Sequence, residues 1–185
     1  LATGRKWTNC DSVGFANKQN VYSDGENPFR MGTARKAKAT KRKKFSQVIY
    51  QPRFPEEGKY AVYVSYQTVP KSVSDARYIV YHKGEKTEFT VNQKMGGGTW
   101  VYLGTFDFDR GCNEFNRVVC TNLSSKRGIV TTDAVRFGGG MGNIEREGNL
   151  SELPRCLEGA RYYAQWAGAP YKVYSGREGK NDYAD

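Results

Sequence analysis

The sequence predicts a mainly β protein: an antiparallel, jelly-roll-like β-sandwich with a loop-rich N-terminal lead-in and one C-terminal α-helix. Short runs of aromatic and β-branched residues alternate with a period of two, and clusters of Gly, Pro, Asn and Asp separate them. After residue 153 the apolar period becomes helical. With 185 residues, of which 38% are hydrophobic, the chain is long enough to bury one core.

The stretch of residues 87–108 has the strongest strand pattern. Two runs rich in aromatic and β-branched residues flank a segment that contains the three glycines 96–98. We interpret these runs as one antiparallel strand pair. The large apolar residues of the second run change parity at Gly104, which predicts a β-bulge there.

The remaining elements follow from the turn residues between apolar runs. We expect a loop-rich segment over residues 1–34 and a helix over residues 153–167. The predicted domain organisation is a lead-in at 1–20, a β-sandwich at 21–140, and a Gly-rich connection, helix and tail of a flanking region at 141–185. The predicted strands are residues 45–50, 60–66, 77–83, 87–93, 101–108, 117–122 and 129–137.

The formal net charge of +10 is largely local. Seven of the 29 basic side chains lie between residues 35 and 44, in the run RKAKATKRKK. We expect a solvated, mobile loop here and no nucleic-acid binding, because cations do not alternate repeatedly with stacking aromatics. No apolar run approaches the ~20 residues of a membrane span. The chain does not begin with Met, which suggests a segment of a longer protein.

Residue types that usually perform catalysis are sparse. His82 is the only histidine, so we expect it to be hydrogen-bonded on a sheet face rather than a catalytic base or zinc ligand. Cys112 and Cys120 are close enough to bridge across a hairpin, although free thiols fit equally well. With Cys10 and Cys156 they show no CxxC spacing. We therefore predict no enzyme activity and no cofactor for this chain.

A structural calcium ion is the one metal that the sequence allows. The turn at residues 24–28 carries carboxylate and amide oxygens, although turn residues that bond their own backbone explain it as well. One acidic residue, Asp133, shares parity with the apolar residues of the last predicted strand, where a buried carboxylate must be hydrogen-bonded or paired. The calcium candidates are Asp24, Glu26, Asn27 and Asp133.

Residues 60–137 carry a family resemblance. They contain, in order, YAVYVSY, ARYIVYHKG, FTVNQ, GGGTWVYLGTFDF and TTDAVRF. This series resembles the golvesin C-terminal-like domain, also called the xanthan lyase carbohydrate-binding-like domain, over roughly residues 20–140. The flanking segments ENPFRMGTARKAK, GGGMGNIEREG, LPRCLEGARYYAQWAG and VYSGREGKNDY resemble those of Bacteroidetes envelope proteins named as xanthan lyases. In that group the module interrupts a zinc amidase domain of the N-acetylmuramoyl-L-alanine type.

The resemblance implies a non-catalytic accessory module that binds carbohydrate in a secreted or periplasmic enzyme. Its expected partners are a polysaccharide or peptidoglycan glycan and the adjoining catalytic domain of the parent chain. An alternative is a structural insertion that docks on or shields the zinc amidase-type domain without binding glycan. Sugar rings stack on exposed Trp and Tyr while amides bond their hydroxyls. The carbohydrate candidates are therefore Trp100, Tyr102, Asn92 and Gln93, although Trp100 also suits a core position.

Overall fold

The computed structural model describes residues 2–3, 7–11, 13–16 and 27–138. Within them the chain is mainly β and contains no helix, and every pair of named strands is antiparallel. The prediction of an antiparallel β protein is confirmed; the predicted helix at 153–167 lies outside the described residues. The strands are β1 (Ala2–Thr3), β2 (Thr8–Cys10), β3 (Ala34–Lys38), β4 (Gln47–Tyr50), β5 (Gly58–Val64), β6 (Ala76–His82), β7 (Glu85–Val91), β8 (Val101–Phe108), β9 (Arg117–Thr121), β10 (Ile129–Thr132) and β11 (Val135–Phe137).

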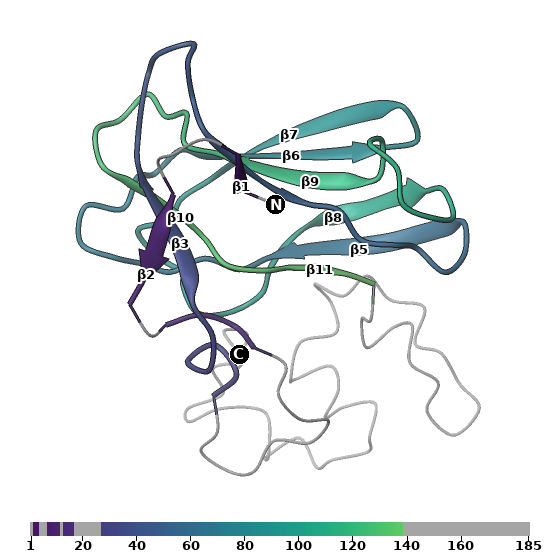
Figure 1. Ribbon diagram of the computed structural model, residues 1–185, viewed down its shortest axis with the longest axis horizontal. Coiled ribbons are helices and arrows are strands. Elements are labelled where there is room, and N and C mark those ends of the chain that lie inside the picture. The colour runs from purple at the N-terminus through teal and green to yellow at the C-terminus, as the bar shows by residue number, and fades with distance from the viewer. Residues whose placement is uncertain (1, 4–6, 12, 17–26, 139–185) are drawn as a thin grey trace, which may run out of the picture. The chain divides into compact units, whose positions relative to one another are not determined.

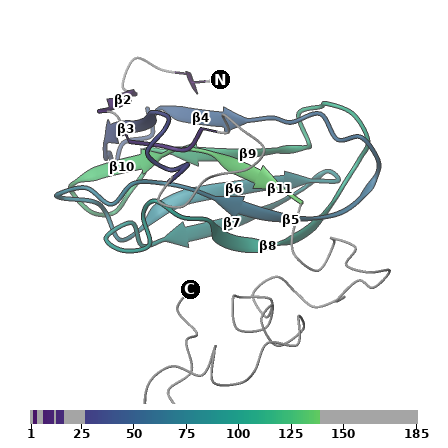
Figure 2. The ribbon, with the colours of Figure 1, turned by 90° about the horizontal axis from the view of Figure 1, so that it is seen from below.

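These strands form three sheets. A five-stranded sheet has the order β1-β4-β9-β6-β7, and two three-stranded sheets have the orders β11-β5-β8 and β10-β3-β2. In Figure 1 the strands β7, β6 and β9 lie above β8, β5 and β11, and β2, β3 and β10 gather at one end. Figure 2 shows the same small sheet at that end from below.

The hydrophobic core lies between the five-stranded sheet and the β11-β5-β8 sheet, because its fully buried side chains come from both. On β5, the predicted alternation is confirmed: Val62 and Val64 face this core. β5 is also the central strand of its sheet, as its apolar weight on both sides predicts. Other fully buried core residues are Val73, Ala76, Tyr78, Val80, Phe108, Val118, Cys120 and Val130.

The predicted pairing within residues 87–108 is wrong. The two runs are strands, but β7 pairs only with β6 at the edge of one sheet, whereas β8 pairs with β5 at the edge of another. The glycine-containing segment between them is a crossover that docks on the segment after β5. Tyr66 Oη donates to the Met95 carbonyl (2.7 Å), and Gly98 N donates to the Tyr66 carbonyl (2.8 Å). These contacts replace the turn of a hairpin.

The β-bulge predicted in β8 is confirmed. Val62 pairs with Gly104 and Tyr63 with Tyr102, so Leu103 is the extra residue. Gly104 has a φ of +150°, which L side chains rarely adopt, and the ring of Phe106 lies where its Cβ would be. Because of the bulge, apolar residues on both sides of Gly104 reach the same core.

The basic run is not simply a loop. Residues Ala34–Lys38 form β3, which pairs with β10 on one side and β2 on the other. Ala34 and Ala37 are buried, while the cations between them point to the surface. Residues 41–44, in contrast, are exposed and lie outside any strand. The expectation of a solvated loop therefore holds only for the second half of the run.

The predicted strand 129–137 is divided at Asp133 and Ala134. β10 belongs to the small sheet and β11 to the β11-β5-β8 sheet. Between them the backbone N–H of Asp133 donates to the Ser65 carbonyl (2.9 Å), and Ser65 N donates to the Ala134 carbonyl (2.8 Å). At these hydrogen bonds the chain passes from the β10-β3-β2 sheet to the β11-β5-β8 sheet.

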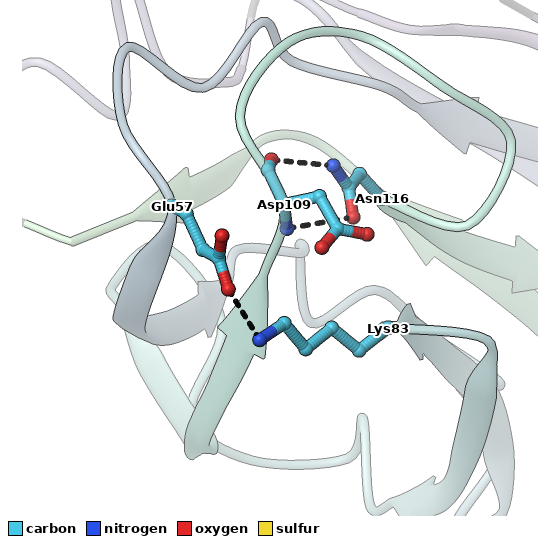
Figure 3. A network of polar contacts seen from close by, with 4 residues as sticks. All are labelled: Glu57, Lys83, Asp109 and Asn116. Atoms are coloured by element: carbon cyan, nitrogen blue, oxygen red, sulfur yellow. Dashed lines mark hydrogen bonds and ion pairs between the residues drawn. The ribbon is translucent and has the colours of Figure 1, made fainter.

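A tight turn joins β6 and β7. Lys83 (φ +44°) and Gly84 (φ +80°) both adopt the left-handed conformation of a two-residue type I′ hairpin turn. Figure 3 shows the Lys83 ammonium paired with Glu57, which precedes β5 in the other sheet. Nearby, the buried Asn116 closes the loop after β8 by donating to the Asp109 carbonyl (2.7 Å).

Candidate functional site

The outer face of the β11-β5-β8 sheet carries the two aromatic candidates. Val101 and Leu103 pack against the core, so Trp100 and Tyr102, which alternate with them, face the opposite way. Tyr102 is partly exposed, whereas Tyr63 on β5 is buried, and the two rings lie 5.2 Å apart with a tilt of 41°. The Tyr102 hydroxyl is 2.8 Å from Thr105 Oγ1. Of this pair only the Tyr102 ring therefore reaches solvent, with the Thr105 hydroxyl beside it.

Trp100 is more constrained than Tyr102. Its ring packs edge-on against Phe15 (centroids 4.9 Å apart) and Phe29 (5.4 Å apart), and these two rings also contact each other. Three rings from distant parts of the chain thus anchor the N-terminal segment near β8. Sequence reasoning missed Phe15 and Phe29, because no periodicity marks the segment that contains them. Trp100 has a packing role here, so Tyr102 is the better platform for a sugar ring.

The two amide candidates differ in surroundings. Gln93 is fully buried; its amide donates to the Thr131 carbonyl (2.6 Å) and accepts from Thr131 N (2.9 Å). Asn92 is exposed, and its side chain accepts from Lys94 N (3.2 Å). No hydrogen bond or ring contact among the described residues joins either amide to Tyr102. Gln93 thus holds β10 in place, while only Asn92 is open to solvent.

The calcium candidates are only partly described. Asp24 and Glu26 lie outside the described residues. Asn27 Oδ1 accepts from Phe29 N (2.9 Å), and the Asp133 carboxylate accepts from Phe15 N (2.8 and 3.0 Å) and Ser65 Oγ (3.1 Å). Within the described part of the chain, no group of three or more His, Cys, Asp or Glu side chains is placed to hold a metal. Calcium binding stays a prediction.

The partly buried Asp133 carboxylate is hydrogen-bonded, as a carboxylate at such a position must be. Burial raises its pKa above the ordinary 3.8, and the donors from Phe15 and Ser65 oppose this rise. The donors are neutral, so no cation is needed to explain the position of the carboxylate. Asp133 therefore fastens the N-terminal segment to the junction of β10 and β11.

The histidine and cysteines show no reactive arrangement among the described residues. His82 Nε2 is 2.9 Å from Thr87 Oγ1, and its ring lies 4.8 Å from that of Phe106, so the predicted hydrogen-bonded histidine is confirmed. Cys112 is exposed and Cys120 is buried, and both are free thiols. Burial raises the pKa of Cys120 to about 12, which keeps it protonated at neutral pH.

Comparison with known proteins identifies the family. The golvesin C-terminal domain family matches residues 8–139, and the chain belongs to this family. A xanthan lyase from Bacillus sp. (strain GL1) is 31% identical over 90 residues, which are 49% of this chain and 10% of that protein. A structure of Paenibacillus xanthan lyase has a TM-score of 0.51 at 24% identity, and the likeness covers 74% of this chain and 12% of that one.

The chain thus spans about a tenth of the length of these xanthan lyases. The structural likeness is a likeness of fold. No helix in the described part of the chain is long and apolar enough to cross a membrane.

Proposed function

We propose that this chain is a non-catalytic carbohydrate-binding module with a β-sandwich fold. It would serve a secreted or periplasmic protein that processes a polysaccharide or peptidoglycan. The family and the similarity to a small part of xanthan lyase support a carbohydrate-associated accessory role. Its glycan partner would be held beside an adjoining catalytic domain of the parent protein, for which the resemblance suggests a zinc amidase.

The observation that carries the proposal is the partly exposed Tyr102 on the outer face of the β11-β5-β8 sheet. Its ring contacts Tyr63 and its hydroxyl lies within hydrogen-bond distance of Thr105, and both contacts restrict the orientation of the ring. A pre-oriented aromatic ring is what the apolar C–H face of a sugar requires, and ordering it in advance lowers the entropy cost of binding. Hydroxyl groups at the ring edge suit the polar rim of the sugar.

Retention on immobilised polysaccharide tests this function. The full chain should be retained by xanthan or by purified peptidoglycan, and Tyr102→Ala should weaken retention by ~1 to 3 kcal/mol, the loss expected for one stacking platform. Tyr102→Phe keeps the ring and should retain most of the binding. Phe115→Ala is the matched control, because Phe115 is also an exposed aromatic (49%) but lies in the loop before β9.

Equal retention of Tyr102→Ala and the wild-type chain would remove Tyr102 from the site. If neither polymer retains the wild-type chain, the glycan-binding proposal fails and the alternative of a docked structural insertion gains support. Thermal melting of each variant shows whether a loss of retention reflects unfolding.

A further inference from the structure

A cleft of about 510 Å³ opens on the small β10-β3-β2 sheet. Its apolar lining is small and comes from Ala37, Gly128 and Ile129, and Thr8 also lines it. Four cationic residues line the same cleft: Lys36, Lys38, Lys71 and Arg127. A cleft lined by both apolar groups and cations fits a ligand that has both a C–H surface and negative charge.

A second cleft, also of about 510 Å³, has similar chemistry. Its lining includes one aromatic residue, Phe45, which is 42% exposed, and two serines, Ser124 and Ser125. Its cations are Lys41, Arg42, Lys43 and Arg77.

The two clefts are neighbours along the same pair of segments, residues 36–45 and 123–129. Lys38 pairs with Ile129 in the sheet, Ala39 N donates to the Gly128 carbonyl (2.9 Å), and Ser124 N donates to the Thr40 carbonyl (3.0 Å). We call the lining of both clefts the basic strip. Because backbone bonds join its two segments, its cations keep a fixed order along the surface.

Little negative charge opposes these cations. Among the residues that the structure describes, neither lining contains a carboxylate. Asp11 pairs with Lys36, but its side chain is 91% exposed, so the pair is strongly screened. Asp75 lies beside the second cleft, where Ser124 and Ser125 donate to its carboxylate. The eight cationic residues of the strip outnumber these two neighbouring carboxylates, so the strip is a surface of positive potential.

Lys71 has a left-handed backbone conformation, which glycine or asparagine adopts with less strain. It is the third residue of a turn closed by Ser72 N and the Val69 carbonyl (3.0 Å), and its φ is +69°. Glycine or asparagine suits that position of a type II turn. A lysine held there keeps its charge at the edge of the first cleft.

We propose that the basic strip binds a polysaccharide that carries carboxylate groups. This inference rests on the proposed function and adds the chemical class of the glycan, at a surface separate from Tyr102. Carboxylates on successive sugars would meet the cations, while C–H faces lie on Ile129 and Phe45. Single-stranded nucleic acid fits less well, because it needs several stacking rings, and Phe45 is the only aromatic among the described lining residues of the two clefts.

The test measures binding of the full chain to polygalacturonate, to the same polymer after reduction of its carboxyl groups, and to single-stranded DNA. We expect wild-type affinity for polygalacturonate to exceed that for the reduced polymer by about tenfold or more and to fall with added salt. The triple variant Lys38→Ala, Lys71→Ala, Arg127→Ala should lose about tenfold. A triple control, Lys59→Ala, Lys94→Ala, Arg110→Ala, removes the same charge from exposed positions outside both clefts and should change affinity less than about twofold.

The single variant Lys71→Asn separates a loss of binding from a loss of folding. It suits the turn, so its melting temperature should be maintained while polygalacturonate affinity falls. Equal affinity for the acidic and reduced polymers, equal losses in the two triple variants, or tighter binding of DNA than of polygalacturonate at the same ionic strength would overturn the inference. If the chain binds a neutral polymer and Tyr102→Ala abolishes this binding, the proposed function is supported although the inference about the basic strip fails. Binding of no polymer would reject both.

Discussion

At the scale of single residues, Asp133 and Asp75 have opposite electrostatic surroundings. Burial raises the pKa of Asp133 above its ordinary value of 3.8. At Asp75 burial also acts to raise the pKa, but hydrogen bonds from Ser124 and Ser125 outweigh it, so the pKa of this carboxyl lies below 3.8.

These shifts predict opposite effects of pH on stability. A raised folded pKa means that Asp133 contributes stability below its unfolded pKa and loses that contribution as pH rises through the folded value. Relative to Asp133→Asn, the wild-type chain should therefore gain stability as pH falls from 7 to about 4. Relative to Asp75→Asn it should lose stability as pH falls below about 4, where the lowered pKa is crossed. Urea unfolding of the three proteins from pH 7 down to about pH 3 checks both signs, and a parallel response of the two variants would contradict them.

Some residue roles could be predicted from local pattern and others could not. The hydrogen-bonded state of His82 follows from its place in a strand without catalytic neighbours. The burial of Gln93 does not, because its partner Thr131 lies 38 residues further along the chain. The neighbouring Asn92 is exposed, and nothing in the sequence distinguishes its surroundings from those of Gln93. A polar side chain near a predicted loop suggests a contact with sugar or water. Only the structure shows whether it instead hydrogen-bonds a strand that is distant in the sequence.

At the scale of elements, the sequence predicts strands better than their partners. Alternation identifies which face of a strand is buried, but it does not say which strand lies beside it. The segment between the predicted strands 77–83 and 87–93 is short enough for a hairpin turn, and β6 and β7 do pair. The longer segment between β7 and β8 does not require a hairpin, and Tyr66 holds it as a crossover instead. β3 escaped prediction because its buried positions are small alanines between cations.

The bulge in β8 predicts the effect of a single methyl group. In Gly104→Ala the new Cβ would lie 2.9 Å from the Phe106 ring and would need a φ of +150°, so we expect a loss of ~1 to 3 kcal/mol of stability. Gly58→Ala is the matched control, because its φ is +157° but no atom lies within 4 Å of the added Cβ. Chemical denaturation should show a larger loss for Gly104→Ala. Equal losses would mean that backbone conformation alone explains the glycine.

At the scale of the whole molecule, the fold separates two surfaces with different chemistry. The outer face of the β11-β5-β8 sheet presents Tyr102, and the segments around the small sheet present the basic strip. The buried core between the larger sheets includes neither Tyr102 nor the cations of the basic strip. Substitutions on either surface should therefore leave the packing of this core unchanged.

We propose that this chain binds a glycan through Tyr102 on the outer face of the β11-β5-β8 sheet. The most direct test is a titration of the isotope-labelled chain with oligosaccharides prepared from xanthan or peptidoglycan, followed by amide chemical shifts. We expect the largest shifts in β8 around Tyr102 and in the neighbouring part of β5 around Tyr63, with smaller ones in the basic strip if the sugar is acidic. Absence of shifts at saturating concentrations, or shifts that leave β8 and β5 untouched, would contradict the claim.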